Sequence, residues 1–448
     1  MIIRHEVGVL RLKRIPIFLL FLLPATLTWL SCGNAAPSGA KTSGLKYRAF
    51  ISNSVSAGTS LAGVYIVDAE NDIFRPISPI SAGTSPGMIV VTPNLGITIV
   101  FSGNGTQTSQ NQLTFINNAT EASAGQLTLP GVTESIVVSP DSSTGYAAVP
   151  TAPVVGQSPG VVDIISLTTG TLESEIDVPS VHYLSIDNSG NRLLGFSDDS
   201  DSLSIITPSQ AGIGNAVTQV GGFNRPVQAF FSSDDSTAYV LNCGPECGGT
   251  QASLQTLDLT TNTPGPAVNL PAGTVALING STMYVAGTPH AAGGAASLLC
   301  PAGTTAALYC GELATVDLPT MSVTNTVVIT DGYHNRMAMA ANGQLFLGAR
   351  TCTEVVAPIP PPAGAEVRGC LSIYNTLPTP VGNAPAGGVL IPPANGDATG
   401  IQPIPTRQVV YVVQGGSLDI YDATTDALQE TQITNIVGQF IDVKTVDF

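Results

Sequence analysis

The sequence predicts an all-β fold, a ring of four-stranded blades known as a β-propeller, and three observations lead to it. Only 10% of the residues are charged, while 47 are glycine and 33 are proline. This composition favours many short strands and turns over helices. A strand pattern also recurs about every 50 residues, a period typical of propellers and solenoids. Finally, the first repeat lacks one strand and the chain ends with a spare one.

The repeat is clearest from Ser135 to Val178. Its four segments are SIVVSPDSS, TGYAAVP, GVVDIISLTTGT and LESEIDV, which are rich in β-branched residues and separated by turn residues. The units Gln228–Gly273 and Gly400–Thr434 repeat the same order. Weaker copies occupy the remaining stretches, namely Gly87–Gly131, His182–Gly222, Thr274–Thr330 and Tyr333–Pro393.

The two ends of the chain are expected to close the ring. The N-terminal unit has three strands, YRAFISN, GVYIVDAEN and FRPISPIS, and the chain ends with GQFIDVKTVDF. We expect the last strand to complete the first blade, which protects the edges that an open sheet would expose. Seven complete units and one composite unit give eight blades in a single domain over residues 46–448. Seven blades would result if one weak copy were a long insertion.

The N-terminal residues 1–31 have the parts of an export signal. A basic leader precedes the uncharged apolar run Ile15–Leu30, which is shorter than the roughly 20 residues that a spanning helix needs. A serine then precedes Cys32, and this ending resembles a bacterial lipoprotein signal, although Trp29 departs from the usual pattern. The resemblance implies that Cys32 is lipidated and carries several acyl chains, enough for firm anchoring. Ordinary cleavage and an uncleaved anchor are the alternatives, and residues 32–45 are expected to form a flexible tether.

The net charge limits the classes of partner. Without residues 1–31 the chain has 11 basic and 30 acidic residues, a formal charge of −19. Nucleic acid requires a basic surface, so we expect no nucleic-acid binding. An acidic body is also unsuited to anionic lipids, so contact with a membrane is expected through the lipid anchor only. The predicted location is outside the cytoplasm, anchored to the outer membrane or cell surface, including its periplasmic side.

The repeat also carries a resemblance to a known family. The pattern S-P-D, A-Y-V and L-T-T-G-T in the unit from Ser135 resembles the bacterial YVTN or lactonase-like β-propeller repeat, over roughly residues 47–448. The resemblance implies the propeller fold. Because propellers support unrelated functions, it transfers little chemistry.

Six cysteines follow Cys32, and neighbouring cysteines bracket one loop in each of three consecutive units. Each of these loops joins the second strand of a unit to the third. The predicted disulfides are Cys243–Cys247, Cys300–Cys310 and Cys352–Cys370. Metal binding by these cysteines is disfavoured, because no histidines follow at ligand spacing. We expect the three loops to form a contact surface on one sector of the ring.

Polar residues near the starts of the first strands are expected to meet at the mouth of the central channel. They are Glu134, His182, Arg225, Gln228, His334, Arg336 and Gln402. Such a ring suits a small polar or anionic ligand, and a wet lining without a ligand is the alternative. A register error of one residue would turn any of them away from the channel. No metal or cofactor is expected, since the acidic clusters at 187–191 and 198–201 match tight turns better than calcium loops.

These observations favour an extracytoplasmic, membrane-anchored propeller that acts as a binding or scaffolding module at the cell envelope, with an envelope protein or a glycan as partner. One alternative is a lactonase-like hydrolase that uses the channel mouth around His182 and Arg336. Another is a structural component of an outer-membrane assembly complex. The sequence contains no recognised catalytic motif, so enzymatic activity, catalytic residues and oligomeric state stay open.

Overall fold

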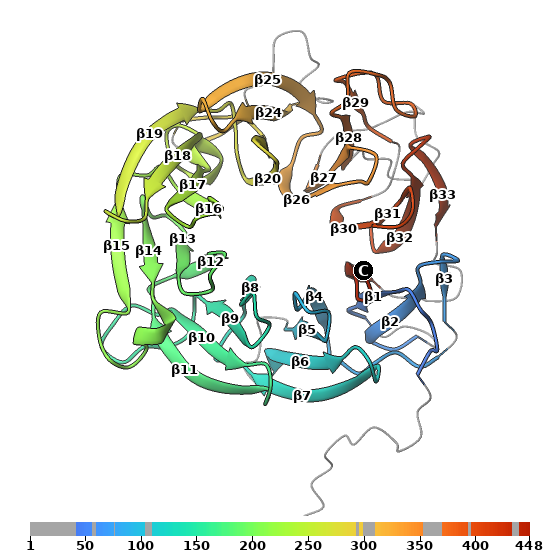
Figure 1. Ribbon diagram of the computed structural model, residues 1–448, viewed down its shortest axis with the longest axis horizontal. Helices are drawn as coiled ribbons and strands as arrows, with labels where there is room; N and C mark the ends of the chain where they lie inside the picture. Colours follow the sequence, from blue (N-terminus) through green and yellow to red (C-terminus); the bar gives the residue numbers. More distant parts are fainter. Residues whose placement is uncertain are drawn as a thin grey trace, which may run out of the picture. The chain divides into compact units, whose positions relative to one another are not determined.

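Eight four-stranded antiparallel sheets surround a common axis in the computed structural model (Figure 1). The structure describes residues 42–55, 60–75, 77–103, 110–292, 295–298, 310–352, 370–392, 396–431 and 439–448. The prediction of an eight-bladed β-propeller is confirmed. Residues 1–41, with the predicted signal and Cys32, lie outside the described residues. Within the described residues, no helix has the length and apolar character needed to cross a membrane.

Blades 2 to 5 follow one another along the chain, each with four consecutive strands, of which the first lies nearest the axis (Figure 1). Blade 2 contains β4 (Pro86–Val91), β5 (Ile97–Ser102), β6 (Gln112–Asn117) and β7 (Ala122–Thr128). Blade 3 contains β8 (Ser135–Val138), β9 (Thr144–Val149), β10 (Val161–Ser166) and β11 (Thr171–Asp177). Blade 4 contains β12 (Val181–Ile186), β13 (Leu193–Ser197), β14 (Ser202–Ile206) and β15 (Val217–Gly221). Blade 5 contains β16 (Pro226–Phe231), β17 (Thr237–Asn242), β18 (Ser253–Asp258) and β19 (Thr263–Asn269).

Blades 6 to 8 continue this order, with an additional hairpin in the loop of blade 6. Blade 6 contains β20 (Val275–Asn279), β21 (Thr282–Gly287), β24 (Gly311–Asp317) and β25 (Ser322–Ile329), and its hairpin is β22 (His290–Ala291) with β23 (Ala295–Leu298). Blade 7 contains β26 (Tyr333–Met339), β27 (Gln344–Arg350), β28 (Leu371–Asn375) and β29 (Val389–Leu390). Blade 8 contains β30 (Ala398–Ile404), β31 (Val409–Gln414), β32 (Ser417–Asp422) and β33 (Ala427–Thr431).

Blade 1 combines both ends of the described chain, as predicted. It contains β1 (Arg48–Asn53), β2 (Gly63–Asp68) and β3 (Ile73–Phe74), with β34 (Phe440–Thr445) as its innermost strand. β34 pairs antiparallel with β1. The last strand therefore closes the ring by completing the first blade.

Ion pairs tie blade 1 to both of its neighbours. On the side of blade 2, Arg48 contacts Glu121 at 2.9 Å and also binds Asp447, which follows β34, through two nitrogen atoms. On the side of blade 8, Arg407 donates two hydrogen bonds of 2.6 Å to Asp72. The composite blade is thus fixed to the ring by side chains as well as by its own backbone pairing.

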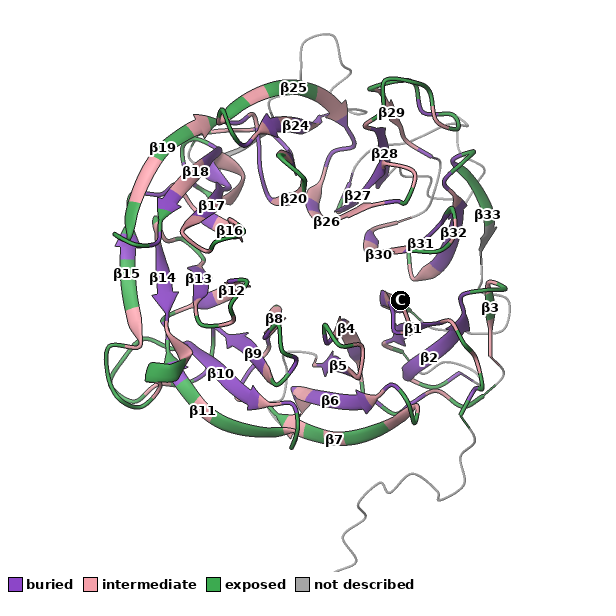
Figure 2. Cartoon of the chain, viewed as in Figure 1, coloured by how far each residue is buried: buried purple, intermediate pink, exposed green. Residues whose placement is uncertain are grey.

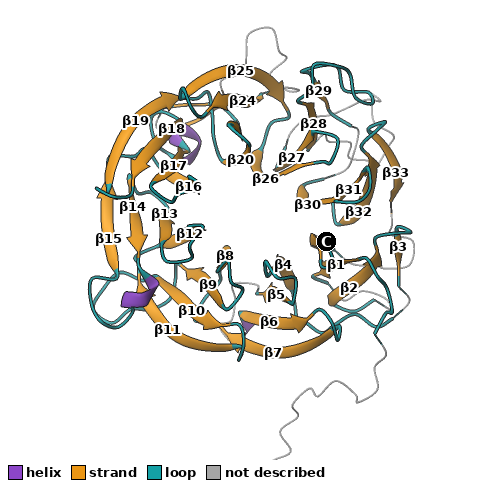
Figure 3. Ribbon diagram, in the orientation of Figure 1, coloured by secondary structure: helices purple, strands orange, loops and turns teal. Residues whose placement is uncertain are grey.

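Burial is greatest in the two middle strands of a blade, lower in the innermost strand and lowest in the outermost strand (Figure 2). All six residues of β2 and of β31 are buried, whereas most residues of the outer strand β11 are exposed. Middle strands pack against the neighbouring blades on both faces, so their sequences read as nearly continuous apolar runs. Figure 3 shows that loops and short helical turns connect the strands.

Several of the innermost strands begin with a β-bulge, an additional residue without a partner on the next strand. The residue without a partner is His182 in β12, Val227 in β16, Asn335 in β26 and Thr399 in β30. A bulge adds one residue to a strand and redirects the side chains that follow. These bulges determine which side chains reach the channel mouth.

Side chains of the innermost strands also connect neighbouring blades. In four cases, a side-chain oxygen atom on the innermost strand of one blade accepts a hydrogen bond from a backbone N–H on the innermost strand of the following blade. The pairs are Ser135 with Leu184 (3.0 Å), Ser185 with Ala229 (3.2 Å), Gln228 with Ala276 (3.2 Å) and Asp442 with Ile89 (3.1 Å). These bonds hold the wall of the channel in place.

Candidate functional site

A cavity of about 570 Å³ lies where the innermost strands begin, and we call it the axial cavity. Seven of the eight blades contribute to its wall, and blade 8 is the exception. Its polar lining includes Glu134, Gln228, Asn335, Arg336 and Arg350. This is the channel mouth that the sequence predicted, and three of the predicted residues, Glu134, Gln228 and Arg336, share it.

The positive charge of the axial cavity comes from Arg336 and Arg350. Arg336 donates to the backbone oxygen of Thr399 through Nε (2.7 Å) and to that of Asn335 through Nη1 (3.0 Å). The Nε atom of Arg350 is buried and has no hydrogen-bond partner among the described residues. Burial, followed by repulsion from Arg336, lowers the pKa of Arg350. Two guanidinium groups thus face one cavity, and neither forms an ion pair with a described carboxylate.

A buried acceptor lies beside these donors. The Oδ1 atom of Asn335, on the bulge of β26, is buried and has no hydrogen-bond partner within the described part of the chain. Buried polar atoms in native proteins are normally paired, so each exception calls for an explanation. A bound ligand that accepts from Arg350 would satisfy its Nε atom.

His182 lies between two carboxylates at the edge of the mouth. Its Nδ1 atom is 3.6 Å from Glu134, and its Nε2 atom is 3.3 Å from Asp198. The proximity of the two side chains raises the pKa of His182 and lowers that of Glu134, although burial acts against both shifts. Tyr183 also donates a hydrogen bond of 3.2 Å to Glu134. The arrangement favours the protonated imidazole ring.

A smaller cavity of about 250 Å³ adjoins the axial cavity, and we call it the rim cavity. Its wall includes Asp198 and Asp199 after β13, Arg225 before β16, and Phe196. Arg225 lies 3.9 Å from Asp199 and 3.8 Å from Asp201. The predicted residue Arg225 therefore faces this second cavity.

Two tyrosines separate the cavities and line both of them. Tyr183 comes from β12 in blade 4 and Tyr333 from β26 in blade 7, and Val227 is the third shared residue. The two hydroxyl groups interact, and burial raises the pKa of each. The tyrosines thus approach each other over the channel mouth from distant blades.

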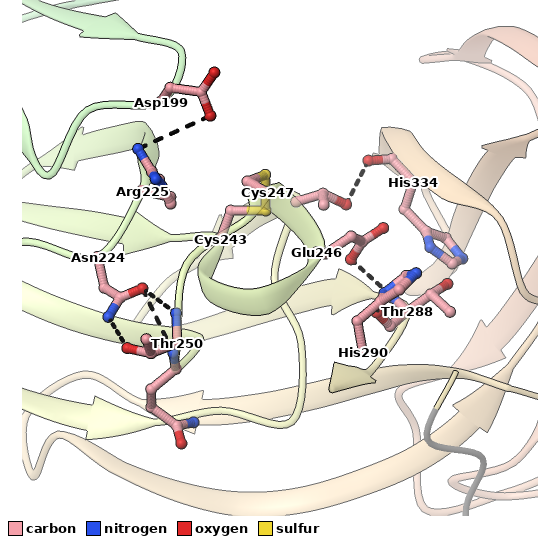
Figure 4. The surroundings of a disulfide bond; sticks show 12 residues. Asp199, Asn224, Arg225, Cys243, Glu246, Cys247, Thr250, Thr288, His290 and His334 are labelled. Atoms are coloured by element: carbon pink, nitrogen blue, oxygen red, sulfur yellow. Dashed lines mark hydrogen bonds and ion pairs between the residues drawn. A yellow bond between two sulfur atoms is a disulfide. The ribbon is translucent and has the colours of Figure 1, made fainter. Parts of the chain in front are cut away.

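A disulfide fixes one wall of the rim cavity. Cys243 and Cys247 are joined across a short helical turn between β17 and β18, as predicted, and Cys247 lines the cavity (Figure 4). The same turn holds Glu246, which accepts a hydrogen bond of 2.8 Å from the backbone of Thr288 in blade 6. Burial raises the pKa of Glu246 to about 8, so its carboxyl group is mostly neutral at pH 7.

The other predicted disulfides lie in the next two blades. Cys352 and Cys370 are joined between β27 and β28, which confirms that pair. Cys300 lies outside the described residues, so Cys300–Cys310 stays a prediction. Among the described residues, no cluster of three or more His, Cys, Asp or Glu side chains could hold a metal ion.

The structure places two predicted residues away from the mouth. His334 is fully buried between blades 6 and 7, where burial lowers its pKa to about 4. Gln402 lines a different cavity, together with Lys444, farther along the innermost strands. Gln402 comes three residues after the bulge residue Thr399, so it lies past the mouth.

The bulge explains the position of His334. The sequence aligned His334 with His182, but His334 precedes the bulge residue Asn335, whereas His182 is itself the bulge residue. His334 therefore corresponds to Val181, which is also fully buried. A shift of one residue between two repeats decided whether a histidine faces the channel or the core.

The residues of the site that were not predicted include Tyr183, Tyr333, Asn335 and Arg350. Tyr333 occupies the position of Arg225, two residues before the bulge residue. Arg350 ends the second strand of its blade, and its pairing with Tyr333 brings it to the same rim. A search of the last residue of each second strand for charged side chains would have found Arg350.

Comparisons with known proteins agree with the fold. No protein-family model and no curated protein matches the chain. The solved structure of dihydro-heme d1 dehydrogenase NirN in complex with DHE matches with a TM-score of 0.58 and 11% identity, over 90% of this chain and 75% of that chain. What the two share is the propeller fold.

Two further solved structures match less well. The periplasmic gluconolactonase PpgL of Pseudomonas aeruginosa has a TM-score of 0.47 and 14% identity, over 89% of this chain and 98% of that chain. The hydrazine synthase of Kuenenia stuttgartiensis has a TM-score of 0.47 and 17% identity, over 66% of this chain and 77% of that chain. Identities this low transfer no activity.

Proposed function

We propose that the protein is a binding module that takes a small anionic ligand in the axial cavity. The observation that carries the proposal is the pair Arg336 and Arg350, which face one cavity and form no ion pair with a described carboxylate. Arginine is the residue best suited to carboxylate and phosphate groups, because its planar donors match their oxygen atoms. An anion between the two guanidinium groups would relieve their repulsion and satisfy Nε of Arg350.

The geometry favours binding over hydrolysis. A hydrolase that used His182 or His334 as its general base would need that histidine neutral and next to the cavity. His182 lies against two carboxylates that favour its charged form, and His334 is enclosed in the core. Neither histidine is placed to activate a nucleophile. The same ionised groups suit the recognition of a charged ligand.

The test is the binding of simple anions, measured by isothermal titration calorimetry. Inorganic phosphate and hexanoate are the probes, with wild type, Arg350→Ala and Arg192→Gln. Hydrogen bonds to charged groups contribute about 1.5–3 kcal/mol, so loss of Arg350 is expected to weaken binding by roughly 10-fold or more. Arg192→Gln removes the same charge outside the cavity, in the turn before β13, and is expected to bind as wild type does.

Two results would contradict this function. One is a wild-type protein that binds neither probe. The other is an Arg350→Ala protein that keeps wild-type affinity and a wild-type melting temperature.

We further propose that Cys32 anchors the module to a membrane at the cell envelope, where an envelope protein or a glycan is its partner. The serine before Cys32, the apolar run and the disulfides support this proposal. Palmitate labelling of cells that express wild type or Cys32→Ser tests the anchor. Label in wild type alone is expected, and an unlabelled wild type would remove the anchor.

A further inference from the structure

The two cavities at the channel mouth have opposite electrostatic character. Among the described residues, the axial cavity is lined by Arg336 and Arg350 and by one carboxylate, that of Glu134. In the described part of the chain, the rim cavity is lined by Asp198 and Asp199 and by one guanidinium, that of Arg225. The cavities share three wall residues, so one elongated molecule could reach both.

The negative end has a carboxylate available to a ligand. Arg225 lies between Asp199 and Asp201, so the cation of the rim cavity already has two acidic neighbours. Asp198 contacts His182 at 3.3 Å, and its side chain keeps 62% of its accessible surface. Carboxylates therefore outnumber cations at this end, and Asp198 can accept from a further donor.

The wall of the rim cavity also suits a positive charge. Tyr183, Phe196 and Tyr333 contribute aromatic rings to a space of about 250 Å³. Faces of aromatic rings attract ammonium groups, and the attraction grows when the cation loses part of its water. Val227 and Pro226 complete an apolar surface between the charged groups.

We propose that the ligand of this site is a zwitterion, with its carboxylate at Arg336 and Arg350 in the axial cavity and its amine at Asp198 in the rim cavity. A short apolar spacer lies against Val227, between Tyr183 and Tyr333. This inference rests on the proposed function, because it assigns the second end of the ligand whose anionic end defines that function.

The electrostatic free energy of binding is expected to favour a zwitterion over a plain anion or a plain amine. A plain anion in the axial cavity leaves Asp198 without a new partner. A plain amine in the rim cavity leaves the two arginines facing each other. A ligand with both charges compensates both ends. The electrostatic gain is expected to be larger at the arginine end, because Nε of Arg350 is buried without a partner among the described residues. An ω-amino acid with separated charges is the simplest chemical form that fits.

The experiment compares matched ligands that differ only in the amine. Butyrate, pentanoate and hexanoate are titrated calorimetrically beside 4-aminobutyrate, 5-aminopentanoate and 6-aminohexanoate. At one of the three lengths, the amine is expected to tighten binding by at least about 10-fold. Asp198→Asn should abolish this gain and leave the affinity for the plain carboxylate within about threefold. Asp177→Asn, on the exposed outer strand β11, is the matched control and should preserve the gain.

The outcomes distinguish the two proposals. If the plain carboxylates bind and the amine adds nothing at any length, the zwitterion is overturned and anion binding stands. If the amine helps equally in wild type and in Asp198→Asn, the assignment of Asp198 is overturned. If no ligand of either series binds wild type, both proposals fall.

Discussion

Deletion of residues 439–448 is expected to prevent the ring from folding. This segment contains β34, whose side chains Phe440 and Val443 are buried, and Val446 behind it is buried as well. Burial of each such side chain contributes about 1.5–3 kcal/mol, so their joint loss approaches the 5–15 kcal/mol that stabilises a typical protein. The deletion also exposes β1 as an open edge. Circular dichroism during thermal unfolding should show no cooperative transition.

A synthetic peptide of residues 439–448 provides the control for this prediction. If the deletion acts through the missing strand, the added peptide should pair with β1 and restore a cooperative transition. Val443→Asp in the full chain should destabilise strongly, because it buries a charge. Val443→Ile keeps the apolar character and should have a much smaller effect. A truncated chain that melts like wild type would show that the ring does not need β34.

Asp163 is expected to make the protein less stable as the pH rises. It lies on β10 in blade 3 with 1% of its surface exposed, and neither carboxylate oxygen has a hydrogen-bond partner among the described residues. Burial, and then the nearby Glu175, raises its pKa to about 7 from the model-compound value of 3.8. The folded protein therefore binds a proton more tightly than the unfolded chain, and this stabilisation is lost as the pH rises from about 4 through about 7.

Asp163→Asn removes the titration and should remove this slope. A shift of one pKa unit corresponds to 1.36 kcal/mol, so the stability of the variant relative to wild type should rise by about 2.5 kcal/mol between pH 5 and pH 8. Urea unfolding at several pH values measures the difference. The informative quantity is how the difference in free energy of unfolding between variant and wild type changes with pH. The asparagine side chain can also shift stability by an amount that does not depend on pH. Glu173→Gln, on the exposed strand β11, should show no such change, and a pH-independent difference for Asp163→Asn would contradict the prediction.

Sequence reasoning predicted the ring because its signals are repeated. The strand pattern recurs in every blade, and the missing first strand matches the spare strand at Phe440–Thr445, so errors in one unit are corrected by the others. The disulfide pairs followed from the same repetition. Structural features that recur in every repeat can therefore be predicted from the sequence alone.

The site depends instead on departures from the repeat. The bulges at His182 and Asn335 shift the register by one residue, and nothing in the sequence marks their positions. His334 consequently lies in the core, while Tyr333 reaches the channel mouth beside Tyr183. Residue-level contacts across the channel join blades that are distant in sequence, so a repeat alignment cannot predict them.

The composite blade imposes an order on biosynthesis. β1 leaves the ribosome among the first strands, yet its inner neighbour β34 is made almost 400 residues later. Until then the nascent chain carries an unpaired edge at β1, and contacts between such distant segments form slowly. Each interrupted translation product lacks β34 and keeps that edge open. Ring closure therefore distinguishes a chain that contains β34 from one that lacks it, because the latter keeps an exposed edge at β1.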